Sequence, residues 1–279
     1  MQLFEAISEI RQVRWRDPAA TWGLVPTMGF LHEGHMSLVA RAREENERVG
    51  VSIFVNPAQF NNPNDLTRYP RNTRRDLELL ESAGADLVWM PEPDTVYPDG
   101  YQTYVDVEAI TRPLEGASRG GHFRGVATVV SKLFNVFEPH RAYFGQKDAQ
   151  QALTIKRMVD DLNFNLTVEV CDTIRESDGL ALSSRNVRLS PQARAEAPCL
   201  YKGLEAAQTA FAQGHRDAEH LRSLVRDKVI TSTTASLEYV SVADPQTLGE
   251  LEHAKAGALV SVAADFGDVR LIDNCVLGD

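Results

Sequence analysis

Short apolar runs alternate with stretches of helical periodicity through the first two-thirds of the chain. The apolar runs lie at residues 22–25, 49–55, 86–90, 141–144 and 166–170. Their length and β-branched composition are typical of buried parallel strands. Between them, apolar residues recur at helical spacing, as in 35–48 and 125–137. This order predicts an α/β fold with a parallel sheet and right-handed crossovers.

Two weaker patterns add elements to this picture. Residues 3–14 carry apolar positions at helical spacing, which predicts an N-terminal amphipathic helix. Residues 104–108 alternate between polar and apolar side chains, which predicts a short strand.

The alternation of predicted strands and helices ends near residue 178. Two helices, from Ser190-Pro191 onward and over 218–229, precede predicted strands at 237–243, 259–264 and 269–272. Helices followed by strands, without parallel alternation, are typical of a small α+β domain. We therefore expect two domains, 1–177 and 178–279.

Composition narrows the class of protein. The chain has 279 residues, of which 43% are hydrophobic and 24% charged, and a formal net charge of -10. This acidity argues against nucleic-acid binding, which needs a basic face. Three widely spaced cysteines indicate a reducing compartment. Without an apolar run of membrane-spanning length or a signal peptide at residues 1–16, we expect a cytoplasmic protein with no membrane partner.

Polar clusters follow several predicted strands, and the most informative one contains His32 and His35. They lie where a strand ends and a helix begins, which is the ligand crevice of open α/β sheets and a place suited to phosphate. The histidines are three residues apart around a glycine, whereas a zinc-protease pair is four apart on one helix face. The stretch alone leaves open phosphate chemistry or an incidental turn with two surface histidines.

Further motifs narrow these alternatives. His-Glu-Gly-His at 32–35 resembles the HxGH signature of the nucleotidyltransferase superfamily, and Pro-Thr-Met-Gly at 26–29 resembles one family within it, the pantothenate synthetases (pantoate–β-alanine ligases). Other segments that resemble this family are 56–60, 120–125, 145–148, 183–185 and 270–274. The chain departs from the family pattern at Leu182, Gly120 and Arg75, where Met, Pro and an acidic residue are usual.

The resemblance implies roles for individual residues. The implied ATP-binding residues are Thr27, Met28, Gly29, His32, Gly34, His35, Gly145, Gln146, Lys147, Asp148, Ile174, Leu182, Ser183, Ser184 and Arg185. His32, His35 and Lys147 are the implied catalytic residues. The implied pantoate-binding residues are Pro26, Met28, Gln59 and Gln151, with β-alanine beside Gln59. Asp76 falls where the family has an acidic residue linked to Mg²⁺, which we expect to be held mainly by ATP oxygens and water.

The resemblance also implies a fold and a reaction. The fold would be a Rossmann-like parallel sheet carrying the HxGH motif, with a smaller α+β C-terminal lid domain. The reaction would be ATP-dependent condensation of pantoate with β-alanine through a pantoyl-adenylate, by a homodimer. Two alternatives stay open, another HxGH nucleotidyltransferase and an inactive nucleotide-binding sensor of the same fold. A class I tRNA synthetase fits less well, because the chain is short and acidic.

Overall fold

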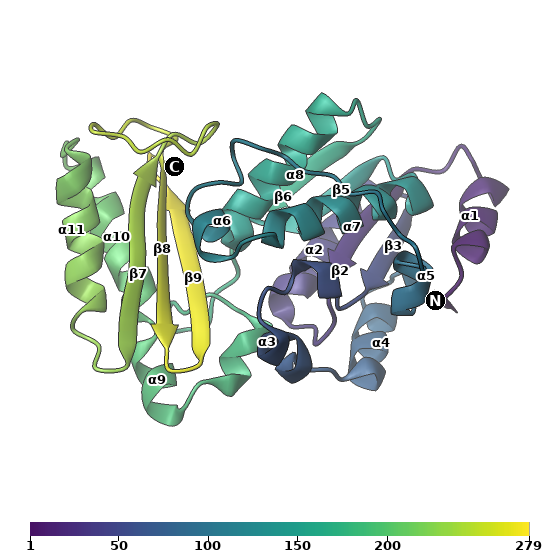
Figure 1. Ribbon diagram of the computed structural model, residues 1–279, viewed down its shortest axis with the longest axis horizontal. Helices are drawn as coiled ribbons and strands as arrows, with labels where there is room; N and C mark the ends of the chain where they lie inside the picture. The colour runs from purple at the N-terminus through teal and green to yellow at the C-terminus, as the bar shows by residue number, and fades with distance from the viewer. Residues whose placement is uncertain (279) are drawn as a thin grey trace. The chain divides into compact units, whose positions relative to one another are not determined.

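The computed structural model describes residues 1–278 and divides the chain into two compact units (Figure 1). The first unit comprises Met1–Gln146 and Gln150–Asp172. The second comprises Lys147–Ala149 and the chain from Thr173 onward. Each unit has a sheet and a core of its own.

The first unit contains a six-stranded parallel sheet in the order β1-β4-β3-β2-β5-β6. These strands span Gln2–Phe4 (β1), Leu87–Trp89 (β4), Arg48–Ile53 (β3), Trp22–Thr27 (β2), Arg141–Gly145 (β5) and Thr167–Cys171 (β6). Strands β2, β3 and β4 are almost wholly buried, as expected of a parallel sheet covered on both faces.

Helices cover both faces of this sheet, because successive strand residues point to opposite sides. Leu24 packs in a core with α1 (Ile7–Arg16), α7 (His122–Phe137) and α8 (Ala149–Asp161). Its neighbour Val25 packs in a second core with α2 (Glu33–Glu45) and α4 (Thr73–Ser82). The shorter helices are η1 (Pro57–Gln59), α3 (Pro63–Arg68), α5 (Pro93–Val96), α6 (Glu115–Ser118) and η2 (Gln146–Asp148).

Two predicted elements of this unit are wrong. The sequence predicts the N-terminal helix over residues 3–14. Leu3 instead belongs to β1, which pairs with β4, and the helix begins only at Ile7. Residues 104–108 form no strand, since the Val105 amide donates to Thr128 Oγ1 of α7 at 3.0 Å instead of joining a sheet. Their alternation still has a physical basis, because Val105 and Val107 pack against the core that α7 helps to form.

The second unit contains a three-stranded antiparallel sheet, β7 (Ala235–Ala243), β8 (Leu259–Phe266) and β9 (Val269–Val276). The helices α9 (Pro191–Glu196), α10 (Cys199–Ala212) and α11 (Ala218–Val229) precede it, after the short helix η3 (Ser184–Arg188). Helices α10 and α11 lie beside this sheet (Figure 1). Alternate β8 residues, including Val260 and Val262, pack in one core with these helices. The predicted fold class, a parallel α/β sheet with a smaller α+β part, is thus confirmed.

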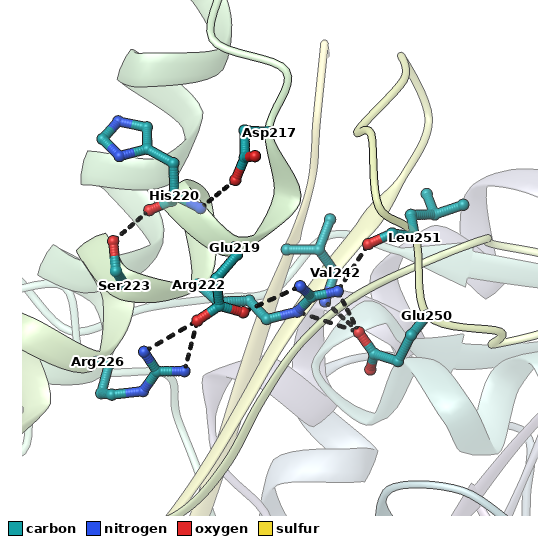
Figure 2. Close-up of polar contacts among 9 residues, drawn as sticks. All are labelled: Asp217, Glu219, His220, Arg222, Ser223, Arg226, Val242, Glu250 and Leu251. Atoms are coloured by element: carbon teal, nitrogen blue, oxygen red, sulfur yellow. Dashed lines mark hydrogen bonds and ion pairs between the residues drawn. The ribbon is translucent and has the colours of Figure 1, made fainter.

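Polar contacts attach α11 to this sheet and its loops (Figure 2). The Asp217 carboxylate caps the helix by accepting from the His220 amide at 2.7 Å. One turn later, Arg222 Nη2 donates to Glu250 Oε2 at 2.6 Å and to the Leu251 carbonyl at 2.7 Å. The guanidinium therefore links the helix to the segment that follows β7.

No helix within residues 1–278 combines the length and the apolar character needed to span a bilayer.

Candidate active site

Three adjacent strands of the first unit end at one edge of the sheet. β3, β2 and β5 are neighbours, and all three are parallel. The segments that follow their carboxyl ends contain Asn56–Gln59, Met28–His35 and Gln146. Polar groups gathered at this edge occupy the position where open α/β sheets bind ligands.

The loop between β2 and α2 has an unusual backbone. Gly29 and Phe30 both adopt positive φ, at +80° and +50°. A side chain at Gly29 would meet Ile53 and Asp76 at 3.1 and 3.2 Å, so both the backbone and the available space favour glycine. Positive φ is strained for phenylalanine and persists only where the surroundings enforce it.

Asp76 of α4 supplies that enforcement. Its Oδ2 accepts from the Phe30 amide at 2.7 Å, and its Oδ1 accepts from the Leu31 amide at 2.8 Å. The side chain is almost fully buried, at 1% exposure. Arg75 adds a third contact by donating to the Leu31 carbonyl at 2.7 Å. Helix α4 therefore determines the path of the loop that leads into the histidine motif.

The residues available for a metal are few. Within residues 1–278, no group of three or more His, Cys, Asp or Glu side chains could hold a metal ion. Both Asp76 oxygens already accept backbone N–H groups. The link of Asp76 to Mg²⁺ stays a prediction, and the contacts of this side chain serve the loop.

His32 and His35 lie together at the start of α2. Their ring centroids are 4.0 Å apart, and the rings are tilted by 39°. The His32 amide donates to His35 Nδ1 at 3.3 Å. Because Nδ1 accepts this bond, the neutral His35 ring carries its proton on Nε2. His35 is therefore a hydrogen-bond donor through Nε2, at a helix N-terminus that favours an anion.

Thr27 and Gln59 both make contacts at the end of β2, where Met28 lies. Thr27 Oγ1 donates to the Ser52 carbonyl at 2.7 Å and accepts from the Gly29 amide at 3.3 Å, which ties the end of β2 to β3. Gln59 Nε2 lies 3.2 Å from Met28 Sδ. The structure thus brings together Met28 and Gln59, two of the predicted pantoate-binding residues.

Helix α7 supports Gln59 from the other side. His122 Nδ1 lies within hydrogen-bond distance, 2.8 Å, of the Gln59 carbonyl oxygen. A Cβ atom at Gly125 would lie 2.2 Å from the Ala58 carbonyl oxygen, so only glycine permits the close approach of α7 to η1. The Gly-His-Phe-Arg-Gly sequence at 121–125 therefore packs under the Gln59 turn.

The two glutamines at the start of α8 differ in their surroundings. Gln150 is buried, accepts from the Glu115 amide at 3.0 Å and donates to the carbonyls of Ile110 and Pro113 at 2.9 and 2.8 Å. Its side chain holds the 110–115 loop. Gln151 is half-buried, and no hydrogen bond within residues 1–278 joins it to Gln59. Its pantoate contact stays a prediction.

In the second unit, Ile174, Leu182 and Ser183–Arg185, all predicted to bind ATP, lie in a turn that hydrogen bonds hold together. The Leu182 amide donates to the Ile174 carbonyl at 3.0 Å, and the backbones of Arg175 and Ala181 form an antiparallel β-bridge. Ser183 begins η3 by accepting from the Arg185 amide at 3.2 Å through its hydroxyl. Ile174, Leu182 and Ser183–Arg185 are therefore parts of one folded turn.

Strand β9 holds this turn and the segment of Lys147. Asp273, buried at 3% exposure, accepts two hydrogen bonds from the Arg175 guanidinium, at 2.6 and 2.9 Å. The next residue, Asn274, donates from Nδ2 to the Lys147 carbonyl at 2.9 Å. Lys147 Nζ lies 3.9 Å from Asp148 Oδ1.

Sequence reasoning did not assign these supporting roles. Asn56, His122 and Asn274 each contact a residue of the predicted site, and Asp273 binds Arg175, the neighbour of the predicted Ile174; none of the four was in the predicted set. The only available signal was that the Asp-Asn pair ends the 270–274 motif and that Asn56 and His122 lie inside motifs.

Comparison with known proteins identifies the family of the chain. The chain matches the family described as pantoate-beta-alanine ligase over residues 2–276. Proteins named pantothenate synthetase from Herpetosiphon aurantiacus and Acetivibrio thermocellus are 54% and 50% identical to it, with 99% of this chain and 100% and 99% of theirs covered.

Two solved structures are similar over almost the whole chain. Pantothenate synthetase from Thermus thermophilus is 45% identical, with a TM-score of 0.95 and 99% of both chains covered. Pantoate-beta-alanine ligase from Francisella tularensis, complexed with beta-gamma ATP and beta-alanine, is 36% identical, with a TM-score of 0.82 and 99% of this chain and 97% of that chain covered.

Proposed function

The chain belongs to the pantoate–β-alanine ligase family, and from this premise we propose how its own residues carry out the reaction. It is a ligase that joins pantoate to β-alanine, with ATP as a substrate. The relatives that match 99% of this chain at 50–54% sequence identity are named pantothenate synthetase. They do not favour a different nucleotidyltransferase activity or an inactive sensor.

In the first step, the pantoate carboxylate attacks the α-phosphorus of ATP. The new bond joins a carboxylate oxygen to phosphorus, the bond to the bridging oxygen breaks, and pyrophosphate leaves with its electron pair. The product is a pantoyl-adenylate. Catalysis of this kind is mostly positioning and stabilisation of charge on phosphate oxygens.

The histidine pair carries this proposal. His35 accepts the His32 amide at Nδ1, so its neutral ring carries the proton on Nε2, and an N–H donor at the N-terminus of α2 suits a phosphate oxygen. We assign His32 and His35 to the nucleotide, together with the backbone of Thr27, Gly29 and Gly34. Lys147 and the Ser183–Arg185 turn would neutralise the departing pyrophosphate, since Arg and Lys suit phosphate oxygens. Gly145, Gln146 and Asp148 flank Lys147, and Ile174 and Leu182 flank the turn.

Magnesium enters this scheme as part of the nucleotide. The described residues offer no cluster of metal ligands, and both oxygens of Asp76 accept backbone amides. Mg²⁺ would therefore be held mainly by ATP oxygens and water. No step assigned to this chain's residues depends on a protein-bound ion.

In the second step, the β-alanine amine attacks the acyl carbon of the adenylate, the amide forms, and AMP leaves. Gln59, Gln151, Pro26 and Met28 would hold the pantoyl group, with β-alanine beside Gln59. An amide side chain suits this task because it donates and accepts hydrogen bonds. Residues 178–279 would act as a lid over residues 1–177, because water must be excluded from the mixed anhydride.

Two further properties belong to the same proposal. We expect a homodimer, on the basis of the family resemblance, which light scattering of the purified protein would test. We expect the cytoplasm as its location, because all three cysteines are free thiols.

The test of the function is an omission assay. AMP should form from ATP only when pantoate and β-alanine are both present, and pyrophosphate–ATP exchange should require pantoate but not β-alanine. His35→Ala should lower both rates at least about 100-fold, the usual contribution of a positioned proton donor, without unfolding the protein. Exchange at the wild-type rate would remove His35 from the mechanism.

The chain offers a matched control for the histidine variant. His215 and His220 form a second histidine pair, with ring centroids 4.9 Å apart, and both are exposed on the second unit. His220→Ala should leave AMP formation unchanged. ATP binding without any pantoate-dependent exchange would identify the protein as a sensor and overturn the proposed reaction.

A further inference from the structure

A tyrosine outside every motif of the sequence contacts the pantoate-binding turn. Tyr97, which follows α5, donates from its hydroxyl to Asn56 Oδ1 at 2.8 Å. Asn56 is itself buried at 1% exposure and begins η1, the turn that contains Gln59. The contact joins residues 41 positions apart.

The Asn56 amide has one possible orientation in this environment. Its Oδ1 accepts from the Ala58 amide at 3.3 Å as well as from Tyr97. Its Nδ2 donates to the Gly125 carbonyl at 3.2 Å and to Gln59 Oε1 at 2.9 Å. Backbone groups cannot exchange donor for acceptor, so the Ala58 amide and the Gly125 carbonyl establish which end of the Asn56 amide is oxygen.

The orientation of Asn56 determines that of Gln59. Because Asn56 Nδ2 is a donor, the atom facing it must be the acceptor Oε1 of Gln59. The donor Nε2 consequently lies on the opposite side, 3.2 Å from Met28 Sδ in the loop that leads to the histidines. Gln59 therefore presents N–H groups, and not its oxygen, toward that loop.

Tyr97 is held in place as the donor to Asn56. Its ring packs against Phe54 and Tyr101, with centroids 6.4 and 5.1 Å away, and its backbone amide donates to the Pro93 carbonyl at 2.7 Å. Burial, with smaller contributions from Tyr101 and Tyr104, raises the pKa of the Tyr97 phenol above its ordinary value. The hydroxyl keeps its proton, and the Asn56 oxygen accepts it in a hydrogen bond.

We infer that Tyr97 is a positioning residue for pantoate, which acts through Asn56, together with the Ala58 amide and the Gly125 carbonyl, to keep the N–H side of Gln59 toward an acceptor oxygen of the substrate. The inference rests on the proposed role of Gln59 in pantoate binding. It assigns a direction to that contact, in which the protein donates and a pantoate carboxylate or hydroxyl oxygen accepts.

The test separates the KM for pantoate from the KM for ATP. Removing one hydroxyl in Tyr97→Phe leaves the ring packing in place, and should raise the KM for pantoate about fivefold, the size of one lost hydrogen bond, while the KM for ATP stays unchanged. Tyr101→Phe is the matched control. Its ring contacts Tyr97, but its hydroxyl makes no hydrogen bond within residues 1–278, and its KM for pantoate should equal that of the wild type.

A double-mutant cycle distinguishes positioning from general destabilisation. Gln59→Ala should raise the KM for pantoate, and adding Tyr97→Phe to it should cause no further increase, because Tyr97 acts only through the Gln59 amide. A further fivefold increase in the double variant, or an equal rise in the KM for ATP, would overturn the inference.

Two other outcomes are distinguishable. If Gln59→Ala raises the KM for pantoate but Tyr97→Phe does not, the inference fails and the role of Gln59 stands. If Gln59→Ala has no effect on pantoate, the proposed role of Gln59 fails first, and that of Tyr97 fails with it. Thermal unfolding of each variant establishes that the measured proteins are folded.

Discussion

At the scale of single residues, one carboxylate accounts for the shape of the histidine loop. Gly29 and Phe30 both have positive φ, and Asp76 accepts from the Phe30 and Leu31 amides. The resemblance linked Asp76 to magnesium. That link stays a prediction, and the observed contacts of Asp76 give it a role in stabilising a strained loop, where such strain is commonly used to organise a site.

Asp76→Asn tests this role. Asparagine has one acceptor oxygen, so one of the two amides would face an N–H₂ group instead of an acceptor. We expect kcat/KM for ATP to fall about 10- to 100-fold, since an unsatisfied buried donor costs roughly 1–3 kcal/mol. The Mg²⁺ concentration that gives half-maximal activity should stay unchanged.

A matched control lies on the same helix. Glu78 is exposed on α4, and its ion pair with Arg74 is long, at 3.7 Å, so Glu78→Gln should behave as the wild type. A large increase in the Mg²⁺ requirement of Asp76→Asn would show that the carboxylate is a metal ligand after all.

At the scale of elements, local sequence signals account for where several helices begin. Asn72 caps α4 by accepting from the Arg75 amide, and Ser190 caps α9 by accepting from the Ala193 amide, with Pro191 in the first turn. Such caps satisfy amides that the helix itself leaves unpaired. What they do not specify is the partner of each element, as the N-terminal strand β1 illustrates.

One ionisable residue links α9 to the start of β7. Glu196 accepts from the Ser232 hydroxyl at 2.6 Å and from the Thr234 hydroxyl and amide at 2.9 and 3.0 Å. These hydrogen bonds, led by those of Ser232 and Thr234, hold the pKa of Glu196 far below its usual value. A lowered pKa means that the ionised form stabilises the fold.

The pH dependence of stability follows from the sign of that shift. The stabilisation is fully present above the pKa of the unfolded chain, about 4.3, and is lost as the pH falls toward the lower pKa of the folded state. Glu196→Gln should therefore have a lower Tm than the wild type at pH 7, and the difference should shrink at pH 3. A difference in Tm that is constant from pH 7 to pH 3 would contradict this prediction.

At the scale of the whole molecule, the last strand organises segments that lie far from it in sequence. Asp273 holds Arg175, which forms a β-bridge with Ala181 just before the Ser183–Arg185 segment, and Asn274 holds the Lys147 carbonyl. Two segments assigned to phosphate are thus anchored on consecutive residues of β9. This gives the 270–274 motif a physical role that its sequence does not reveal.

Asn274→Ala removes the donor to the Lys147 carbonyl. We expect the KM for ATP to rise about threefold to tenfold, the effect of one hydrogen bond, with the KM for pantoate unchanged. Gln208→Ala is the control, because Gln208 Nε2 also donates to a β9 carbonyl, that of Val276, at 3.3 Å. Equal kinetic changes in both variants would indicate a general loosening of β9 and not a role at Lys147.

The sequence by itself determined the class of fold and the positions of the reactive motifs. Apolar runs of strand length, helical periodicity and capping residues are local properties, and so is the His32–His35 spacing, because each depends on neighbours in the chain. The same local signals failed at residues 104–108, whose alternation packs against α7 without entering a sheet.

Only the tertiary structure decided which residues hold the motifs in place. Asp76, Tyr97 and Asn274 contact loops 45, 41 and 127 positions away, and no periodicity reports such a contact. The physical reason is that buried polar groups must find partners wherever the fold places them. Partners of that kind are specified by three-dimensional packing, and their choice becomes visible only when the sheet and its loops are assembled.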